Sequence, residues 1–168
     1  ESDESRDNYG PMRLMEILTE DRVMLTRDLA TKHAALDAVA ALLARASNDI
    51  SVAAVRAVLE ERELLQSTGI GDGVAIPHGF LPEITHQVAA LVVAPEGVPF
   101  DAIDDRPARI IVGVLGPKRG MHAQVEHLRI LARVSKVLRE SNTRASILEA
   151  SSPAQVFAHL RDADARVP

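Results

Sequence analysis

Two uninterrupted apolar runs constrain the fold of this chain more than any other feature of its sequence. The first lies within residues 87–94 and reads VAALVV from Val88 to Val93, and the second lies within residues 109–115 and reads IIVGVL from Ile110 to Leu115. A strand with one solvated face alternates apolar and polar residues, whereas a strand buried on both faces is apolar throughout. The two runs therefore predict central strands of a sheet that is covered on both faces.

Segments with helical spacing supply the expected cover. Helices are predicted at residues 32–46, 52–65, 121–138, 142–150 and 153–162. Thr31 and Ser51 are expected to cap the first two helices, and Ser152 with Pro153 to open the last one. Short strands are predicted at 22–25 and 74–76, and a turn-rich connection at 95–107. Together these elements predict an α/β fold, a mixed β-sheet sandwiched by helices on both faces.

The length of 168 residues suits a single domain with a sizeable core. We expect that domain at residues 12–164, followed by a short tail at 165–168. The acidic and polar segment 1–11 is expected to be a disordered leader or a tag.

Composition excludes several classes of function. The formal net charge of −5 and the 2% of aromatic residues argue against a nucleic-acid partner. The chain has no cysteine, so disulfides, thiolate catalysis and cysteine-bound zinc are excluded. No apolar stretch approaches the roughly 20 residues that a spanning helix needs. These facts predict a cytoplasmic protein without direct membrane insertion.

A glycine-rich segment, 67–73, precedes the short strand that is predicted at 74–76. Its three glycines alternate with other residues, and no Lys-Ser or Lys-Thr pair follows them. The spacing therefore matches neither the dinucleotide fingerprint nor the nucleotide-binding P-loop. On the residues alone, the segment is interpreted as a tight turn in which glycine adopts positive φ values.

His78 follows Pro77, where the short strand is expected to end, and Gly79 after it would leave room for a partner. A histidine with an ordinary pKa near ~6.5 is largely neutral at cytosolic pH. Neutral imidazole is a nucleophile with no proton to lose from the attacking nitrogen, so it can accept a phosphoryl group directly. The alternative is a turn histidine that only hydrogen-bonds its neighbours.

His127 and Arg62 are further candidates. His127 lies near the start of the helix at 121–138, where the helix dipole favours an anion, and it could donate a hydrogen bond to a phosphorylated His78. Arg62 ends the second helix and could pair with phosphate. The alternatives are a helix-surface histidine and a salt bridge within the cluster at 60–63. A zinc site from His78, His122 and His127 is a further alternative, although their spacing fits no helical metal pair.

Four features of the sequence together resemble a known family. The run STGIGDGVAIPHG, from Ser67 to Gly79, resembles the signature of IIA domains of the fructose–mannitol type in the bacterial phosphotransferase system. That family includes the nitrogen-regulatory IIA protein. The segments FDAID (100–104) and EHL (126–128) resemble it as well, and Arg62 lies sixteen residues before His78, where the family has its active-site arginine. The resemblance covers about residues 13–160.

The resemblance implies a phosphotransferase with a phosphohistidine intermediate. His78 would take the phosphoryl group from the phosphocarrier HPr or its nitrogen-branch counterpart, and His127 and Arg62 would support the transfer without any cofactor or metal. Phe80, Ile70 and Met121 are expected to form an apolar rim. The residues expected to bind phosphate or the partner are Thr68, Gly69, Gly71, Gly79, Phe80 and Glu126.

The eventual recipient of the phosphate is left open between three functions. The STGIG and FDAID segments are most similar to the nitrogen-regulatory subgroup, which predicts a regulatory component that acts on a kinase or a transporter. The first alternative is a IIA subunit that passes phosphate to the IIB component of a fructose- or mannitol-type permease. The second is a non-catalytic adaptor.

Overall fold

The two apolar runs form the two long central strands of the sheet. Strand β5 (Val88–Val98) pairs antiparallel with β6 (Ala108–Pro117), and Leu91 lies opposite Val112. The structure is a computed structural model that describes residues 12–168, so the leader expected at 1–11 lies outside the described residues.

The other strands make the sheet mixed. Strand β1 (Val23–Leu25) runs parallel to β5, whereas β3 (Val74–Ala75) and β4 (His78–Leu81) both run parallel to β6. Strand β2 (Gly69–Gly71) closes a short antiparallel hairpin with β3. The order is β1-β5-β6-β3-β2, with β4 also paired to β6.

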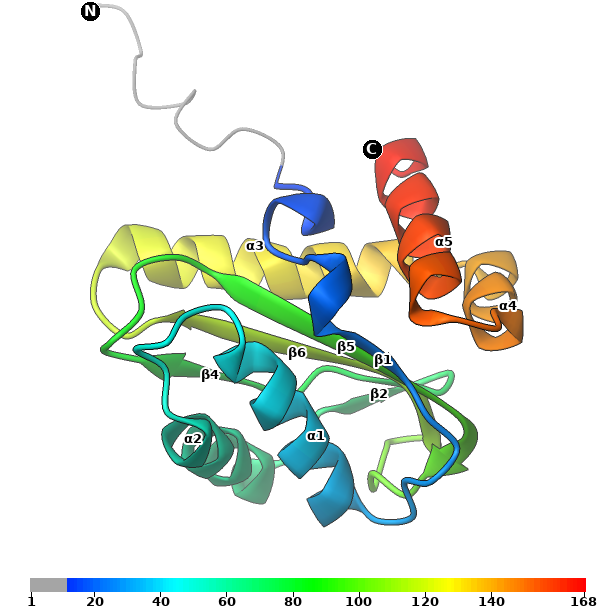
Figure 1. The fold of residues 1–168 in the computed structure, drawn as a ribbon, viewed down its shortest axis with the longest axis horizontal. Coiled ribbons are helices and arrows are strands. Elements are labelled where there is room, and N and C mark those ends of the chain that lie inside the picture. Colours follow the sequence, from blue (N-terminus) through cyan, green and yellow to red (C-terminus); the bar gives the residue numbers. More distant parts are fainter. Residues whose placement is uncertain (1–11) are drawn as a thin grey trace, which may run out of the picture.

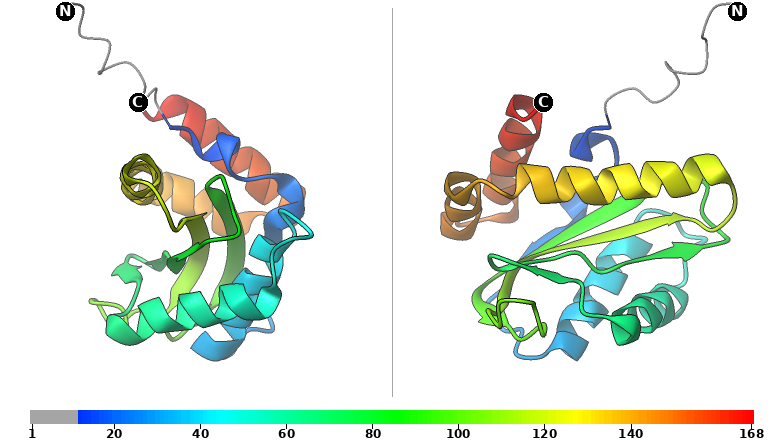
Figure 2. Two further views of the ribbon diagram at one scale, coloured as in Figure 1. Left: turned by 90° about the vertical axis from the view of Figure 1, so that its left-hand side faces the viewer. Right: turned by 180° about the vertical axis from the view of Figure 1, so that it is seen from behind.

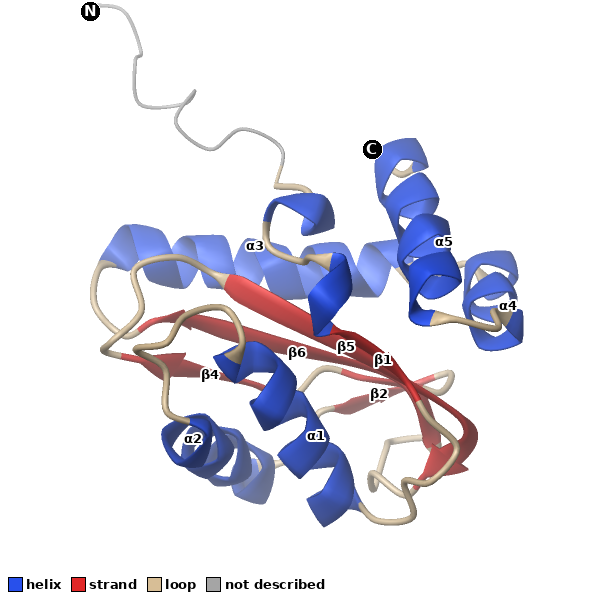
Figure 3. Cartoon of the chain, viewed as in Figure 1, coloured by secondary structure: helices blue, strands red, loops and turns tan. Residues whose placement is uncertain are grey.

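Helices cover both faces of this sheet (Figures 1 and 3). Helices α1 (Lys32–Ala44) and α2 (Val52–Leu65) cover one face. The other face is covered by α3 (Met121–Val137), α4 (Ser141–Glu149) and α5 (Pro153–Arg166), together with the 3-10 turn at Leu14–Glu16. A second 3-10 turn, Glu20–Arg22, leads into β1. The side view shows the sheet between the two helical layers (Figure 2).

The alternation of side chains along each strand builds the two cores. In β5, Leu91 and Val93 face α3 to α5, whereas Ala90 and Val92 face α1 and α2. Both sets are buried, which is why the run is apolar throughout. The prediction of a mixed sheet between helical layers is confirmed.

The helix starts follow the predicted caps. The side chains of Thr31, Ser51 and Ser152 accept hydrogen bonds from the amides three residues later, and Pro153 opens α5. No helix within residues 12–168 has the length and apolar character that a membrane span requires.

Three boundaries differ from the prediction. The connection expected at 95–107 begins as strand, because β5 continues through an irregularity in pairing to Val98. The residues expected to form a tail belong to the fold, since α5 runs to Arg166 and Val167 is buried. The chain also re-enters the sheet at His78 instead of leaving it at Pro77, since β4 pairs with β6 from His78 onward. This third difference places the candidate nucleophile on a strand.

A candidate active site with two facing histidines

His78 is the first residue of β4, and its backbone lies opposite Val114 of β6. Its side chain is half-buried, and its Nδ1 lies 2.8 Å from the backbone carbonyl oxygen of Ile76. A carbonyl oxygen only accepts hydrogen bonds, so Nδ1 carries the proton and donates it. The lone pair of the neutral ring is therefore on Nε2.

His127 faces His78 from α3. The two ring centroids are 5.6 Å apart, and the ring of Phe80 lies 4.5 Å from that of His127. His127 is only 1% exposed, so the alternative of a helix-surface histidine is wrong. His127 lies in the second turn of α3, after the residues whose amides are free at the start of the helix. The helix therefore contributes a side chain to this site, and not its free amides, at the position of His127.

The side chain of His127 has one buried hydrogen bond and one unpaired nitrogen. Its Nδ1 lies 2.9 Å from the side-chain oxygen of Gln87, which is also buried. Its Nε2 is buried and has no hydrogen-bond partner among residues 12–168. A buried polar atom without a partner is rare and points to a functional role.

Two hollows meet at His78 and Arg62. The larger, of about 530 Å³, is lined by Val58, Glu61, Arg62, Leu65, His78, Gly79, Phe80, Lys118 and Gln124. The smaller, of about 390 Å³, is lined by the residues 66–70 and by Arg62, Ile76, His78, Ile103, Leu131, Ala132 and Ser135. A group bound to His78 would therefore be accessible from both hollows and would lie beside the guanidinium of Arg62.

Arg62 is held by the end of its own helix. Its Nη1 donates to the carbonyl oxygen of Gln66 at 2.8 Å, and within the described part of the chain no carboxylate lies at ion-pair distance from it. Its neighbour Glu63 is buried and is engaged elsewhere, since it accepts from the amide of Thr68 and pairs with Lys32 at 2.7 Å. The alternative of a salt bridge within 60–63 is therefore wrong.

Burial keeps both histidines neutral. It lowers the pKa of His78, and the positive charge of Arg62 acts in the same direction, against the hydrogen bond to Ile76 and the charge of Glu63. Burial also lowers the pKa of His127 to about 4, and the neighbouring His78 adds to this effect. At neutral pH both rings therefore keep a lone pair.

The shifted pKa of His127 predicts a loss of stability in acid. The unfolded chain protonates this imidazole near pH 6.5 and the folded chain near pH 4, so acidification between these values favours unfolding. We expect a loss on the order of 3 kcal/mol. Urea unfolding of wild type and His127→Gln at pH 7.5 and 4.5 measures it. The stability difference between the two proteins should change with pH, and a constant difference would contradict the predicted shift.

The glycine-rich segment contributes only its first part to the site. Thr68 and Gly69 line the smaller hollow, together with Ile70 of the expected rim. Gly71 pairs with Val74, four residues before His78, and lines neither hollow. Gly71, Asp72 and Gly73 have positive φ values, so the interpretation of a tight turn is correct for this part of the segment.

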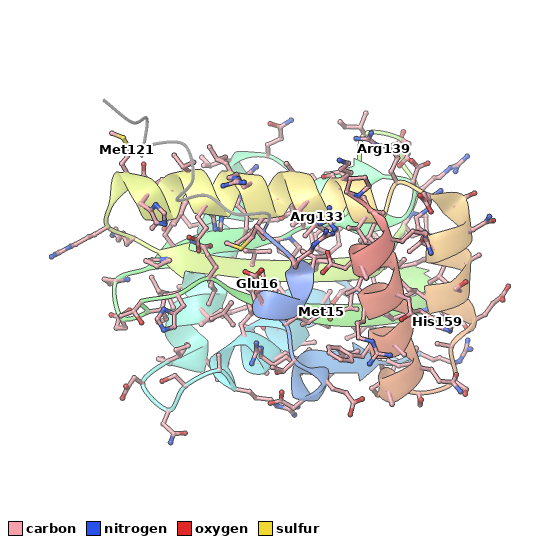
Figure 4. The ribbon with its side chains drawn as sticks, turned by 90° about the horizontal axis from the view of Figure 1, so that it is seen from above. Met15, Glu16, Met121, Arg133, Arg139 and His159 are labelled. Atoms are coloured by element: carbon pink, nitrogen blue, oxygen red, sulfur yellow. The ribbon has the colours of Figure 1, made fainter. Side chains whose placement is uncertain are left out.

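The remaining predicted site residues lie in different environments. Gly79 and Phe80 both line the larger hollow, and a Cβ added to the buried Gly79 would lie 3.1 Å from Val58. The absence of a side chain at Gly79 therefore also allows β4 to pack closely on α2. Glu126 lies 3.3 Å from His122 on α3 and lines neither hollow. Met121 is 82% exposed at the start of α3 (Figure 4).

Two residues of this site were missed in the sequence. Gln87 lies 2.9 Å from Nδ1 of His127, and a Cβ added to Gly116 would lie 2.8 Å from the same atom. The sequence carries a signal for Gln87 alone. Gln87 is the single polar residue in the run 87–94, which is otherwise suited to full burial. Within residues 12–168 no group of three or more His, Asp or Glu side chains is placed to hold a metal ion, so the zinc alternative finds no such cluster.

Comparisons with known proteins identify the family of this chain. The family model described as phosphoenolpyruvate-dependent sugar phosphotransferase system, EIIA 2, matches residues 16–163. The chain is 35% identical to the fructose-specific EIIA component of Haloferax volcanii, over 77% of this chain and 82% of that protein. It is 30% identical to a nitrogen regulatory protein of Pseudomonas aeruginosa, over 87% and 93%.

A solved structure of the same kind shares the fold. The nitrogen regulatory protein IIA-Ntr from Neisseria meningitidis superposes with a TM-score of 0.79 at 34% identity, over 88% of this chain and 98% of that one. The two facing histidines thus lie in a fold that this chain shares with a nitrogen regulatory protein. The chain is a member of the EIIA 2 family of the phosphotransferase system, as the sequence motifs predicted.

Proposed function

We propose that Nε2 of His78 accepts a phosphoryl group from a phosphohistidine carrier, either HPr or its nitrogen-branch counterpart. The observation that carries this proposal is the 2.8 Å hydrogen bond from Nδ1 to the Ile76 carbonyl, which leaves the lone pair on Nε2 beside Arg62. In the transfer, that lone pair forms the new N–P bond. The N–P bond of the carrier breaks, and its electron pair returns to the carrier's imidazole.

Arg62 and His127 would stabilise the transferred group. Phosphoryl transfer spreads negative charge over three oxygens, so catalysis depends on positioning and electrostatics. The guanidinium of Arg62 lines both hollows at His78 and has no competing carboxylate among the described residues. The buried Nε2 of His127 has a free hydrogen-bonding position on the same side chain that faces His78. Neither role requires a metal or cofactor.

Exposed apolar side chains around the hollows suit the docking of a carrier protein. Leu65, Ile70 and Ile103 line the hollows and are 81%, 46% and 86% exposed. Apolar side chains that surround a reactive histidine can exclude water from the labile N–P bond once a partner covers them. The partner surface is therefore expected to be apolar around its own histidine.

The regulatory branch is our first choice for the recipient. In this proposal a cytoplasmic protein changes its binding to a kinase or a transporter when phosphorylation adds about −2 charge beside Arg62. The relatives include both a fructose component and nitrogen regulatory proteins, so transfer to a fructose- or mannitol-type IIB component is the second candidate. The adaptor alternative requires that no transfer occurs.

Labelling with phosphoenolpyruvate tests the proposal. The protein is incubated with enzyme I and HPr, and in parallel with the nitrogen-branch pair. We expect acid-labile phosphate, and ³¹P–¹⁵N coupling in a ¹⁵N-histidine sample should place it on Nε2 of His78. Faster labelling by the nitrogen-branch pair favours regulation, and onward transfer to a IIB protein favours sugar transport. Failure of both carriers to label the folded protein would leave only the adaptor.

A further inference from the structure

Gln87 connects His127 to the backbone at the start of the same helix. It lies directly before β5 and is 4% exposed. Its side-chain nitrogen donates to the carbonyl oxygen of Ala123 at 3.0 Å, and its side-chain oxygen lies 2.9 Å from Nδ1 of His127. Since the carbonyl only accepts, the amide has one possible orientation, with its oxygen towards the histidine. Nδ1 of His127 must therefore carry the ring proton.

Gly116 of β6 provides the space for this hydrogen bond. A Cβ at position 116 would lie 2.8 Å from the Gln87 oxygen and 2.8 Å from Nδ1 of His127. Real Cβ atoms do not approach other atoms this closely, so any other residue here would displace one of the two side chains. Position 116 thus leaves the Gln87–His127 pair intact only as glycine.

We propose that Gln87 is a positioning residue, which holds His127 as the Nδ1–H tautomer so that Nε2 takes up a proton only when His78 becomes phosphorylated. This inference rests on the proposed function. In the free protein the lone pair on Nε2 is buried and unpaired, and it would repel a phosphoryl oxygen. A proton on Nε2 converts that repulsion into a charge-assisted hydrogen bond, which is stronger than a neutral one.

The surroundings of His127 explain why the proton arrives with the phosphate. His78 and Phe80 of β4 face the ring, and Gln87 and Gly116 lie next to its Nδ1 atom. The charged groups that act on His78 are Arg62 and Glu63 of α2, and His78 in turn acts on His127. A phosphoryl group on His78 adds about −2 charge within a buried setting and favours the charged imidazole. The proton comes from solvent, and the oxygen of Gln87 stabilises the resulting cation through Nδ1–H.

Nitrogen NMR of the full chain tests the tautomer directly, because protonated and unprotonated ring nitrogens have well-separated ¹⁵N shifts. In wild type we expect His127 to carry its proton on Nδ1, and to gain a proton on Nε2 after phosphorylation. Gln87→Leu should allow the Nε2–H tautomer, whose neutral hydrogen bond to phosphate is weaker than a charge-assisted one. It should therefore slow transfer by about tenfold, the loss typical of partners that orient a functional histidine. Gln87→Glu keeps the accepting oxygen and should restore Nδ1–H.

The pH dependence separates positioning from a merely structural role. Uptake of one proton makes the transfer equilibrium up to about tenfold more favourable per pH unit of acidification. The transfer equilibrium constant of wild type, divided by that of Gln87→Leu with the same carrier, should show this pH slope. The reason is that the variant donates from Nε2–H without taking up a proton. Gln155→Leu, on the exposed start of α5, is the matched control and should behave as wild type.

Several results would overturn the inference. One is a free wild-type His127 that carries its proton on Nε2. Another is a folded Gln87→Leu protein with wild-type ¹⁵N shifts and a wild-type pH slope. A wild type that accepts no phosphate would instead refute the proposed function, and with it the proton uptake. The tautomer in the free protein would then still decide whether Gln87 positions His127.

Discussion

His78→Gln is expected to lower phosphate acceptance to below about 1% of wild type. The glutamine amide nitrogen has no available lone pair, so the substituted side chain cannot form the N–P bond. His127 cannot replace His78 as acceptor, because it is 1% exposed and an incoming carrier cannot reach its Nε2. The measurement is the initial rate and the final extent of labelling from phosphoenolpyruvate through the two carriers.

The matched control for this change is His159→Gln. His159 is an exposed histidine on α5 (Figure 4), and it lines neither hollow at His78. We expect it to accept phosphate as wild type does. The His78→Gln protein should remain folded, since His78 is half-buried and makes one hydrogen bond, worth about 1 kcal/mol. Full labelling of His78→Gln would move the acceptor to another histidine.

Arg133→Met is expected to destabilise the fold by about 3–5 kcal/mol, the usual cost of leaving one partner of a buried ion pair alone. Arg133 and Asp164 are 8% and 1% exposed, and they pair at 3.0 Å between α3 and α5 (Figure 4). Arg133 also donates to the carbonyl oxygens of Val167 and Pro168. Without it, the carboxylate of Asp164 keeps only the amide of Met15 as a partner among the described residues.

Arg161→Met is the matched control, because it removes an arginine from α5, the helix that carries Asp164. Arg161 pairs with Asp162 at the surface, where both side chains are more than half exposed, and such pairs contribute about 0–1 kcal/mol. Urea unfolding at neutral pH gives both free energies. A loss below about 1 kcal/mol for Arg133→Met would mean that the residues around 165–168 are a tail after all.

The long elements of the fold were predictable because each carries its signal locally. The run 88–94 is apolar at every position because both faces of β5 are buried there, and Thr31 and Ser51 cap their helices through hydrogen bonds to amides only three residues away. The hairpin turn at Gly71 to Gly73 was predictable for the same reason, since positive φ values favour glycine. The local sequence did not predict that strand resumes after Pro77. Proline indicates the end of a strand, but the chain from His78 onward pairs with β6.

The three central residues of the candidate site were predictable, and its other residues only in part. The residues His78, His127 and Arg62 were selected through a family motif, and the structure places all three together. Gly71 and Glu126 were selected by the same reasoning and lie outside both hollows. Gln87 was missed because its role depends on Ala123 and His127, which are more than thirty residues away.

The sequence by itself determined the chemical groups that are available, namely the histidines and the arginine of a family motif and no cysteine. It also determined the layered fold, because apolar periodicity records which face of each element is buried. Only the tertiary structure decided which nitrogen of each ring holds the proton. That choice depends on the carbonyl oxygen of Ile76 and the amide of Gln87, and folding alone fixes where these acceptors stand.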